Sequence, residues 1–300
     1  SKTICLKRSL SSNLAVAKIM VTGKATKDKV GDMMDIVKEI LLTAKLDDKE
    51  RFKQMVLETK AGLESSIVSS GNAYVAKRLA AQQCTADAVS EQMSGISYIS
   101  FIRDLVERVD KDWNGVLQQL EDCRKFLING NNCTVNLTAD KETITESKPV
   151  INQLLSDLPK TEFPRQKWDL LLPAENEAFT IPTQVNYIGK GLNLFKETDY
   201  ELSGTSTVIT KHLYASWLWE RVRVVGGAYG CRTSLDSESG VLTFVSYRDP
   251  NVMETVDVYE GTPEFLKTAE MDEDALTKAI IGAIGVVDAY QLPDAKGYTA

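Results

Sequence analysis

The spacing of apolar residues changes near residue 129, and this change constrains the fold more than any other feature of the sequence. Before it, apolar side chains recur every three to four residues, as in Val30, Met33, Val37 and Leu41. This period is typical of amphipathic helices. We predict one strand at 15–22, followed by helices at 28–43, 47–68, 72–83, 86–93, 97–108 and 112–128.

After residue 129, alternating strand-like runs are interleaved with helical ones. We predict strands at 133–138, 184–189, 228–235 and 240–248, the last two forming a hairpin, and helices at 143–157, 203–225, from 249–251 onward, and 272–290. The helix at 203–225 carries apolar residues on more than one face, so we expect it to be mostly buried. Antiparallel hairpins combined with long helices indicate an α+β fold rather than a doubly wound sheet.

A polar stretch at 158–164, marked by prolines, lies between two periodic regions and indicates a domain boundary. We therefore expect a mostly helical first part at 1–160, a linker at 161–183 and a second α+β domain at 184–300. A length of 300 residues allows either one large domain or two medium-sized ones.

The charge balance argues against two classes of function. The chain has 35 Lys and Arg against 42 Asp and Glu, a net charge of −7, whereas a nucleic-acid binder needs a basic face to displace counterions. No apolar run reaches the length of a membrane span, and residues 1–20 do not have the layout of a signal peptide. We expect neither a nucleic-acid nor a membrane partner.

Histidine and cysteine usage limits the chemistry of the chain. His212 is the only histidine, so a zinc motif with two histidines is impossible, and a lone histidine is more often a core residue than a catalyst. The five cysteines are scattered without paired spacing, which indicates reduced thiols in a reducing compartment. We expect this chain to bind no catalytic metal.

The densest glycine cluster is Gly226-Gly227-Ala228-Tyr229-Gly230. A phosphate-binding loop would run from strand to glycines to helix, whereas here a helix precedes the glycines and a strand follows them. One glycine suffices to end a helix, and the additional ones would let an extended substrate approach the backbone. Arg223 and Tyr229 flank this turn and could donate to one carbonyl oxygen, the alternative being a surface arginine and a half-buried tyrosine.

Three separated segments carry a family resemblance. The segment at 223–230 (RVVGGAYG) follows a Trp-rich helix and resembles the C-terminal half of the pitrilysin/insulinase-type zinc metallopeptidases. The segments at 70–81 (SGNAYVAKRLAA) and 91–98 (EQMSGISY) are similar to third-domain helices of the presequence protease branch, which includes falcilysin. The segment at 291–298 (QLPDAKGY) is similar to one near that family's C-terminus.

The resemblance implies a clamshell of four α+β domains that closes on an unfolded peptide. In this reading residues 1–160 are a partial third domain, and 184–300 are a fourth domain truncated at its C-terminus. Arg223 and Tyr229 then correspond to the pair that reaches the substrate carbonyl, and Gly226, Gly227 and Ala228 would contact the substrate. The family's zinc ligands, His-x-x-Glu-His and a distal Glu, lie in its first domain and have no counterpart here.

The function implied is therefore that of a C-terminal portion of a zinc metalloendopeptidase that degrades short unfolded peptides, such as cleaved targeting presequences. Its partners would be the N-terminal half of the same enzyme, which holds the zinc, and the peptide. Its location would be an organellar matrix or stroma, in mitochondria or plastids. The alternative is a non-catalytic structural subunit of the same superfamily, but a scaffold has no need of both Arg223 and Tyr229.

Overall fold

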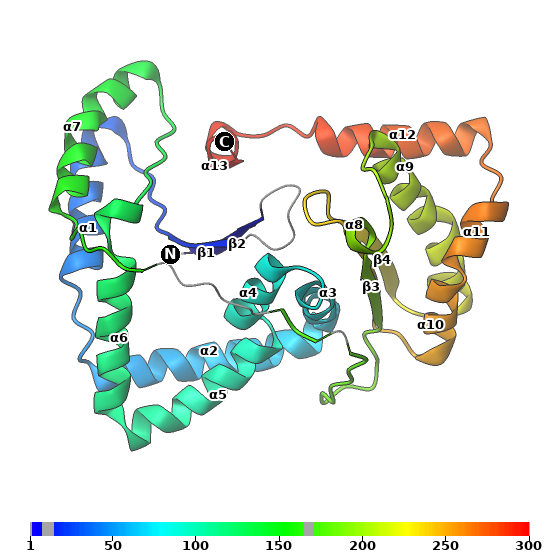
Figure 1. Ribbon diagram of the computed structural model, residues 1–300, viewed down its shortest axis with the longest axis horizontal. Coiled ribbons are helices and arrows are strands. Elements are labelled where there is room, and N and C mark those ends of the chain that lie inside the picture. The colour runs from blue at the N-terminus through cyan, green and yellow to red at the C-terminus, as the bar shows by residue number, and fades with distance from the viewer. Residues whose placement is uncertain (1, 8–14, 165–170, 174, 300) are drawn as a thin grey trace.

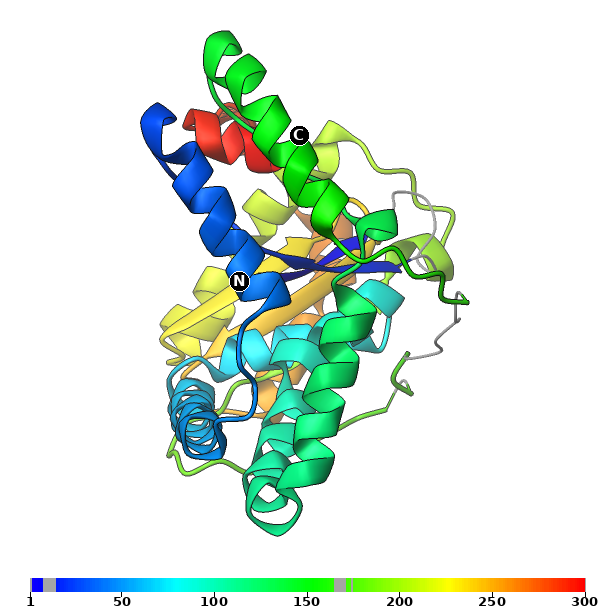
Figure 2. The same ribbon diagram turned by 90° about the vertical axis from the view of Figure 1, so that its left-hand side faces the viewer.

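The computed structural model describes residues 2–7, 15–164, 171–173 and 175–299. It confirms an α+β fold in which long helices surround small antiparallel sheets (Figures 1 and 2). No helix within these ranges is both long and apolar enough to cross a lipid bilayer.

The N-terminal part has one hairpin and seven α-helices within the described residues. Strands β1 and β2 pair in antiparallel fashion, and aspartates cap three of the helices by accepting a hydrogen bond from a first-turn amide, as Asp48 does from Arg51 at 2.9 Å. The helices predicted from the sequence are confirmed to within a few residues. The elements are β1 (Lys2–Lys7), β2 (Ala15–Met20), α1 (Val30–Leu42), α2 (Lys49–Ser69), α3 (Gly71–Ala81), α4 (Thr85–Ser94), α5 (Ile96–Lys111), α6 (Trp113–Leu127) and α7 (Lys141–Asp157).

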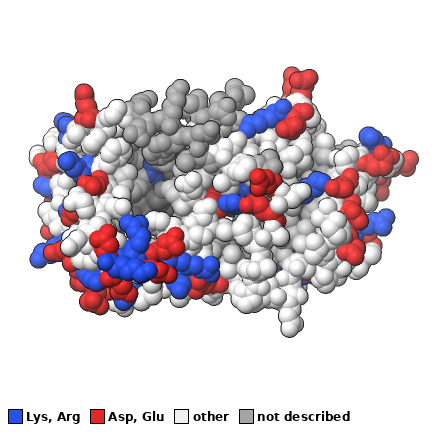
Figure 3. Space-filling model, turned by 60° about the horizontal axis from the view of Figure 1, so that its bottom comes forward, with Lys and Arg blue, Asp and Glu red and all other residues white. Residues whose placement is uncertain are grey.

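A core of apolar side chains joins α2, α5 and α6. Its buried members, Val56, Ile102, Leu105, Val109 and Val116, lie on one face of each helix, as the helical period requires. On the outer faces, Lys and Arg are mixed with Asp and Glu, and this is visible at the lower left of Figure 3. This face presents no large area of a single charge sign.

The C-terminal part is built on a three-stranded antiparallel sheet in the order β3-β5-β4. The predicted hairpin is confirmed, with Gly230 of β4 opposite Tyr247 of β5 and Leu235 opposite Leu242. The helix before β4 is α-helical in its first half and π-helical in its second. The elements are β3 (Gly189–Asn193), α8 (Leu194–Glu197), α9 (Gly204–His212), the π-helix η3 (Leu213–Val225), β4 (Gly230–Leu235), β5 (Val241–Tyr247), α10 (Met253–Glu260), α11 (Thr262–Thr268), α12 (Glu273–Val287) and α13 (Pro293–Thr299).

Helix α3 packs against β3 and β5, so an element of the first part covers the sheet of the second. Two glycines of β3 permit this close approach. A Cβ on Gly189 would lie 2.3 Å from Val75 Cγ1 and 2.7 Å from Leu79 Cδ1, closer than side chains can come. The proposed boundary near 158–164 is therefore crossed by packing, and the division into 1–160, 161–183 and 184–300 stays a prediction.

Three expectations from the sequence are wrong. Residues 133–138 form no strand, because no other strand among the described residues lies beside them and all but one of these residues are exposed. The strand predicted at 184–189 lies instead at Gly189–Asn193, and Asn186 makes only an isolated bridge to Asp249. The helix at 203–225 is not mostly buried, because only one of its faces packs on the sheet and Val225 is 70% exposed.

Candidate active site

The turn between η3 and β4 positions the two residues that the sequence singled out. Gly227 has φ of +78°, a conformation that glycine adopts readily and that ends the helix here. Its amide donates to the Arg223 carbonyl at 3.0 Å, and the Ala228 amide donates to the Val222 carbonyl at 3.1 Å. The turn therefore fixes Tyr229, which immediately precedes β4, against the last turn of η3.

Arg223 and Tyr229 lie side by side at the molecular surface. The guanidinium carbon of Arg223 is 5.2 Å from the centre of the Tyr229 ring and 4.5 Å from that of Trp219. The Tyr229 side chain is 64% exposed, so it is not a core residue. The contact is a guanidinium over ring faces rather than a bond to the phenol oxygen. Such a contact is worth about 0.5–1 kcal/mol at an exposed site and holds both groups in place.

Both polar groups of this pair are free to bind a ligand. Within the described residues, the Tyr229 hydroxyl has no hydrogen-bond partner and Arg223 forms no ion pair with a carboxylate. A positive charge held between aromatic rings and left without a counter-ion is suited to an anionic or strongly polar oxygen.

A row of aromatic rings supports Tyr229 from behind. The Tyr229 ring meets that of Tyr247 edge to face at 5.8 Å, and Tyr247 lies 5.7 Å from Tyr187. The Tyr247 hydroxyl donates to the Ser69 carbonyl at 3.2 Å, and Arg248 lies over the Tyr247 ring. The row thereby connects the turn to the C-terminal end of α2.

Arg248 is the only non-glycine residue in the described ranges with a positive φ, 49°. This bend follows β5 and directs Asp249 into the core, where its carboxylate accepts from the Asn251 amide at 3.0 Å and from the Thr255 hydroxyl at 2.8 Å. The Asn251 side chain in turn donates to the Gly226 carbonyl. The loop after β5 therefore holds the glycine turn.

Gly226, Gly227 and Ala228, the remaining predicted site residues, differ in which of their atoms a substrate could contact. Gly226 and Gly227 leave their backbone uncovered by any side chain of their own, whereas the Ala228 methyl group is buried in the core with Leu218 and Val222. Any contact of Ala228 with a substrate would have to be made through its backbone. Their role as substrate contacts stays a prediction.

His212 belongs to helix packing, as expected for a lone histidine. Its ring is half-buried and stacks on Phe265 at 5.9 Å, and the Ser216 hydroxyl lies 3.4 Å from Nε2. Within the described residues no group of three or more His, Cys, Asp or Glu side chains could hold a metal ion. The donor set of this part of the chain therefore does not fit a catalytic zinc.

Cys231 lies two residues after Tyr229 but is not a candidate nucleophile. Its thiol is buried beside the Tyr259 hydroxyl at 3.7 Å, and this burial raises the pKa of the thiol to about 11. Burial also raises the pKa of Tyr259. Because the thiolate is the reactive form, Cys231 is inert near neutral pH.

This burial predicts a loss of stability at alkaline pH. The unfolded chain releases the Cys231 proton near pH 9.0, but the folded protein holds it to about 11. Between these values the unfolded state binds fewer protons, so the free energy of unfolding falls with rising pH, by up to about 1.4 kcal/mol per pH unit. Urea unfolding of the wild type and of Cys231→Ala from pH 8 to 11 should show a steeper decline for the wild type. If the free energy of unfolding falls equally with pH in both proteins, this prediction is contradicted.

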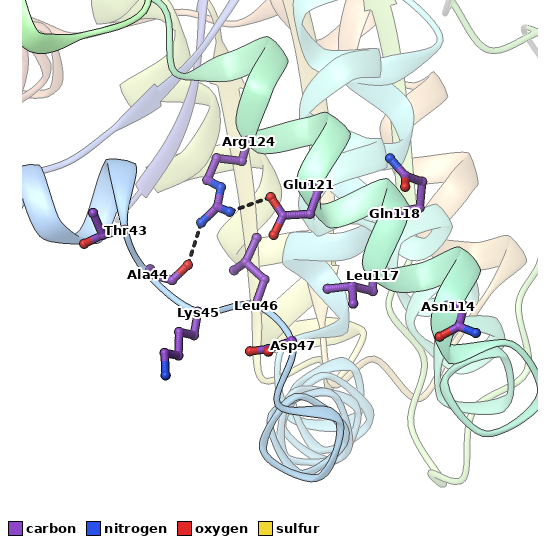
Figure 4. Close-up of a pocket in the computed structure, with 10 residues that line it drawn as sticks. All are labelled: Thr43, Ala44, Lys45, Leu46, Asp47, Asn114, Leu117, Gln118, Glu121 and Arg124. Carbon is purple, nitrogen blue, oxygen red and sulfur yellow. Dashed lines mark hydrogen bonds and ion pairs between the residues drawn. The ribbon is translucent and has the colours of Figure 1, made fainter.

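A second feature, a surface depression of about 410 Å³, lies between the α1–α2 connection and α6 (Figure 4). Arg124 reaches across it, donating to the Ala44 carbonyl and to Glu121. Its guanidinium is thus already occupied, and the residues around the depression show no catalytic pairing. It is formed by elements other than those that carry Arg223 and Tyr229.

Sequence reasoning missed Trp219, Tyr247 and Arg248. Trp219 could have been found from helical spacing, because it precedes Arg223 by four residues and so shares its face. Tyr247 and Arg248 could have been found by counting residues outward along both strands from the hairpin turn. This count places Tyr247 opposite Gly230 and Arg248 opposite Tyr229.

Two further acidic side chains, Asp32 and Glu177, are ordinary ion-pair partners. Asp32 lies 2.9 Å from Lys29 on an exposed surface. Glu177 accepts two hydrogen bonds from Arg78, at 2.7 and 2.8 Å.

Comparison with known proteins connects both parts of the chain to one group of peptidases. Residues 176–300 match the family described as PreP C-terminal domain, and residues 5–105 match a second family, described as peptidase associated. The chain is 45% identical to Presequence protease 1, chloroplastic/mitochondrial, of Arabidopsis thaliana, over 95% of this chain and 26% of that protein.

More distant relatives show similar coverage. Protein HypA of Clostridium perfringens is 31% identical over 89% of this chain and 27% of its own length. The mitochondrial presequence protease of Mus musculus is 26% identical over 89% of this chain and 28% of its own length. The chain spans about a quarter of the length of each of these relatives.

Proposed function

Because this chain belongs to the presequence protease family of peptidases, we propose that it is the C-terminal portion of a zinc metalloendopeptidase that degrades short unfolded peptides, such as cleaved targeting presequences. The observation that carries this proposal is the exposed pair at the end of η3. Arg223 and Tyr229 lie together, uncommitted to any other polar partner in the described residues, on a turn held from two sides.

The pair would act on the carbonyl oxygen of the bond to be cleaved. Peptide hydrolysis passes through a tetrahedral intermediate whose oxygen carries a negative charge, and donors already aimed at that oxygen lower the barrier. Tyr229 offers a phenol hydroxyl and Arg223 a charge that does not titrate. Removing one such donor typically costs about 3–4 kcal/mol of transition-state stabilisation.

The described residues of this chain cannot supply the metal site, so the zinc would be held by another part of the enzyme. When bound there, zinc would supply Lewis-acid polarisation of the peptide carbonyl and activation of the attacking water. The contribution of this chain is then positioning and charge stabilisation at one side of a shared site.

The alternative, a non-catalytic structural subunit, is less well supported. A scaffold gains nothing from an exposed tyrosine beside an arginine that has no carboxylate partner in the described residues, whereas a catalytic surface needs both groups free. The names of the Arabidopsis thaliana and Mus musculus relatives place those two proteins in chloroplasts or mitochondria, and we extend this organellar location to the present protein as part of the proposal.

One experiment tests whether the zinc site lies outside this chain. We expect the purified 300-residue chain to hold no stoichiometric zinc and to cleave no peptide, because one histidine and unpaired cysteines cannot supply three zinc ligands in the usual way. The longer enzyme that the proposal requires should hold zinc and be active. Metal analysis and a fluorogenic peptide assay measure both properties. Zinc together with activity in the 300-residue chain would overturn the assignment.

A further inference from the structure

Strand β4 is an edge strand of its sheet. In the order β3-β5-β4, β5 is paired on both sides, whereas within the described residues β4 pairs with β5 alone. A terminal strand presents backbone N–H and C=O groups that no neighbour uses, and natural proteins often protect such an edge with proline, lysine or a bulge. The sequence of β4, GCRTSL, contains neither proline nor lysine, and its register with β5 is continuous.

The register shows which groups face outward. Ser246 donates to Ile188 at 2.7 Å, so the even-numbered residues of β5 bond toward β3 and the odd-numbered ones toward β4. The odd-numbered residues 241, 243, 245 and 247 lie opposite the even-numbered residues of β4 and the turn. The backbone groups of Cys231, Thr233 and Leu235 therefore point away from the sheet.

This open edge begins beside the proposed catalytic pair. Tyr229 immediately precedes β4, and its exposed ring lies under the Arg223 guanidinium. At about 3.4 Å per residue, the path from Tyr229 to Leu235 is about 20 Å long, enough for a peptide segment of six residues. Along this edge, Arg232 and Ser234 are exposed.

We propose that the free edge of β4 binds an extended peptide as a fourth strand and so presents it to Arg223 and Tyr229. This inference rests on the proposed function and specifies how its substrate is held. Main-chain pairing depends little on side chains, so it suits peptides of varied sequence. Continuity of the edge with the catalytic pair selects a substrate peptide, rather than a second copy of the chain, as the occupant.

Methylated peptides test the pairing directly, with the 300-residue chain and a blocked, fluorescein-labelled nine-residue peptide without proline. One analogue has three N-methyl groups on alternate residues and keeps one unmodified edge. The second analogue has three N-methyl groups on consecutive residues and therefore loses hydrogen-bond donors on both of its edges. We expect the alternate analogue to bind within about threefold of the parent and the consecutive one at least about tenfold more weakly. Equal affinities for the two analogues, or no binding of the parent peptide, would overturn the proposal.

Variants of β4 give an independent test. Thr233→Pro removes an outward amide and no bond to β5, so it should weaken binding of the parent peptide by about tenfold. Thr233→Val, which keeps that amide, should leave binding unchanged. If the proline variant fails to fold, the methylated peptides still decide. A dimer in sedimentation that Thr233→Pro dissociates would mean that a second copy occupies the edge, and would overturn the proposal.

The outcomes separate this inference from the proposed function. If both analogues bind alike while Tyr229→Phe still lowers kcat in the complete enzyme, the strand pairing is wrong and the catalytic role stands. If the methylation pattern is as expected but Tyr229→Phe leaves kcat unchanged, the edge binds peptides and the oxyanion role is wrong.

Discussion

Replacing Arg78 by alanine is expected to lower the free energy of unfolding by about 3–5 kcal/mol, because it leaves a buried carboxylate without its cation. Glu91 is fully buried, and its Oε1 accepts from Arg78 at 3.2 Å and from the Ser97 amide at 3.0 Å. Its Oε2 has no partner in the described part of the chain. Without the guanidinium, the Ser97 amide would be the main support left for this charge.

Arg78 also holds Glu177 and Phe179 against the first part of the chain. Its Nε and a terminal nitrogen hold the Glu177 carboxylate, and the guanidinium keeps the pKa of Glu177 below its ordinary value. The guanidinium carbon lies 5.7 Å from the centre of the Phe179 ring as well. Loss of Arg78 should therefore loosen residues 175–179, leaving them held by the Gln82 side chain, which donates to the Glu175 carbonyl at 3.1 Å and to Glu177 at 3.2 Å.

Urea unfolding of the 300-residue chain measures this effect. Lys53→Ala is a suitable control, because Lys53 pairs with Asp110 on the surface, where solvent screens the attraction and little stability depends on the pair. The double variant Arg78→Met with Glu91→Gln should recover part of the loss, since it removes the buried charge together with its partner. A loss for Arg78→Ala no larger than that for Lys53→Ala would show that Glu91 does not depend on Arg78.

Changing Tyr229 to phenylalanine in the complete enzyme is expected to lower kcat by about a hundredfold or more, with KM little changed. The substitution removes one oxygen and keeps the ring that lies between Arg223 and Tyr247. Because the hydroxyl has no partner in the described residues, stability should change by less than about 1–2 kcal/mol. Steady-state kinetics on a fluorogenic peptide measure both constants.

The chain contains a matched control for this substitution. Tyr214 lies on η3 and is partly exposed, and its ring contacts that of Trp219 at 6.0 Å. Tyr214→Phe removes the same atom near the same cluster and should leave kcat unchanged. Arg223→Lys should be about as damaging as Tyr229→Phe, because a point charge does not reproduce the planar fork or its stacking on Trp219. Wild-type kcat in Tyr229→Phe would mean that the glycines only end the helix.

Local signals in the sequence predicted local structure well. The spacing of apolar residues predicted the helices of the N-terminal part, and the strand-like runs at 228–235 and 240–248 predicted the hairpin. The glycine pair predicted the end of η3 and the approach of Tyr229 to Arg223, since only six residues separate them. These interactions join residues that are close in the chain, so spacing alone identifies them.

Contacts between distant segments could not be predicted in this way. Tyr187 and Tyr247 are 60 positions apart, and Arg78 and Glu177 are 99 apart. Nothing in the spacing of either pair marks them as neighbours. The strand at 133–138 failed for a related reason, because alternation in the sequence does not reveal whether a partner strand is present.

The most direct test of the central claim compares rate with affinity for a transition-state mimic. In the complete enzyme, a phosphinic peptide places a charged tetrahedral group where the reacting carbonyl would lie. If Arg223 and Tyr229 stabilise that charge, then across the wild type, Tyr229→Phe, Arg223→Lys and Tyr214→Phe the inhibition constant should rise in proportion to the fall in kcat/KM, while KM stays nearly constant. An inhibition constant that stays unchanged while kcat/KM falls would contradict the claim.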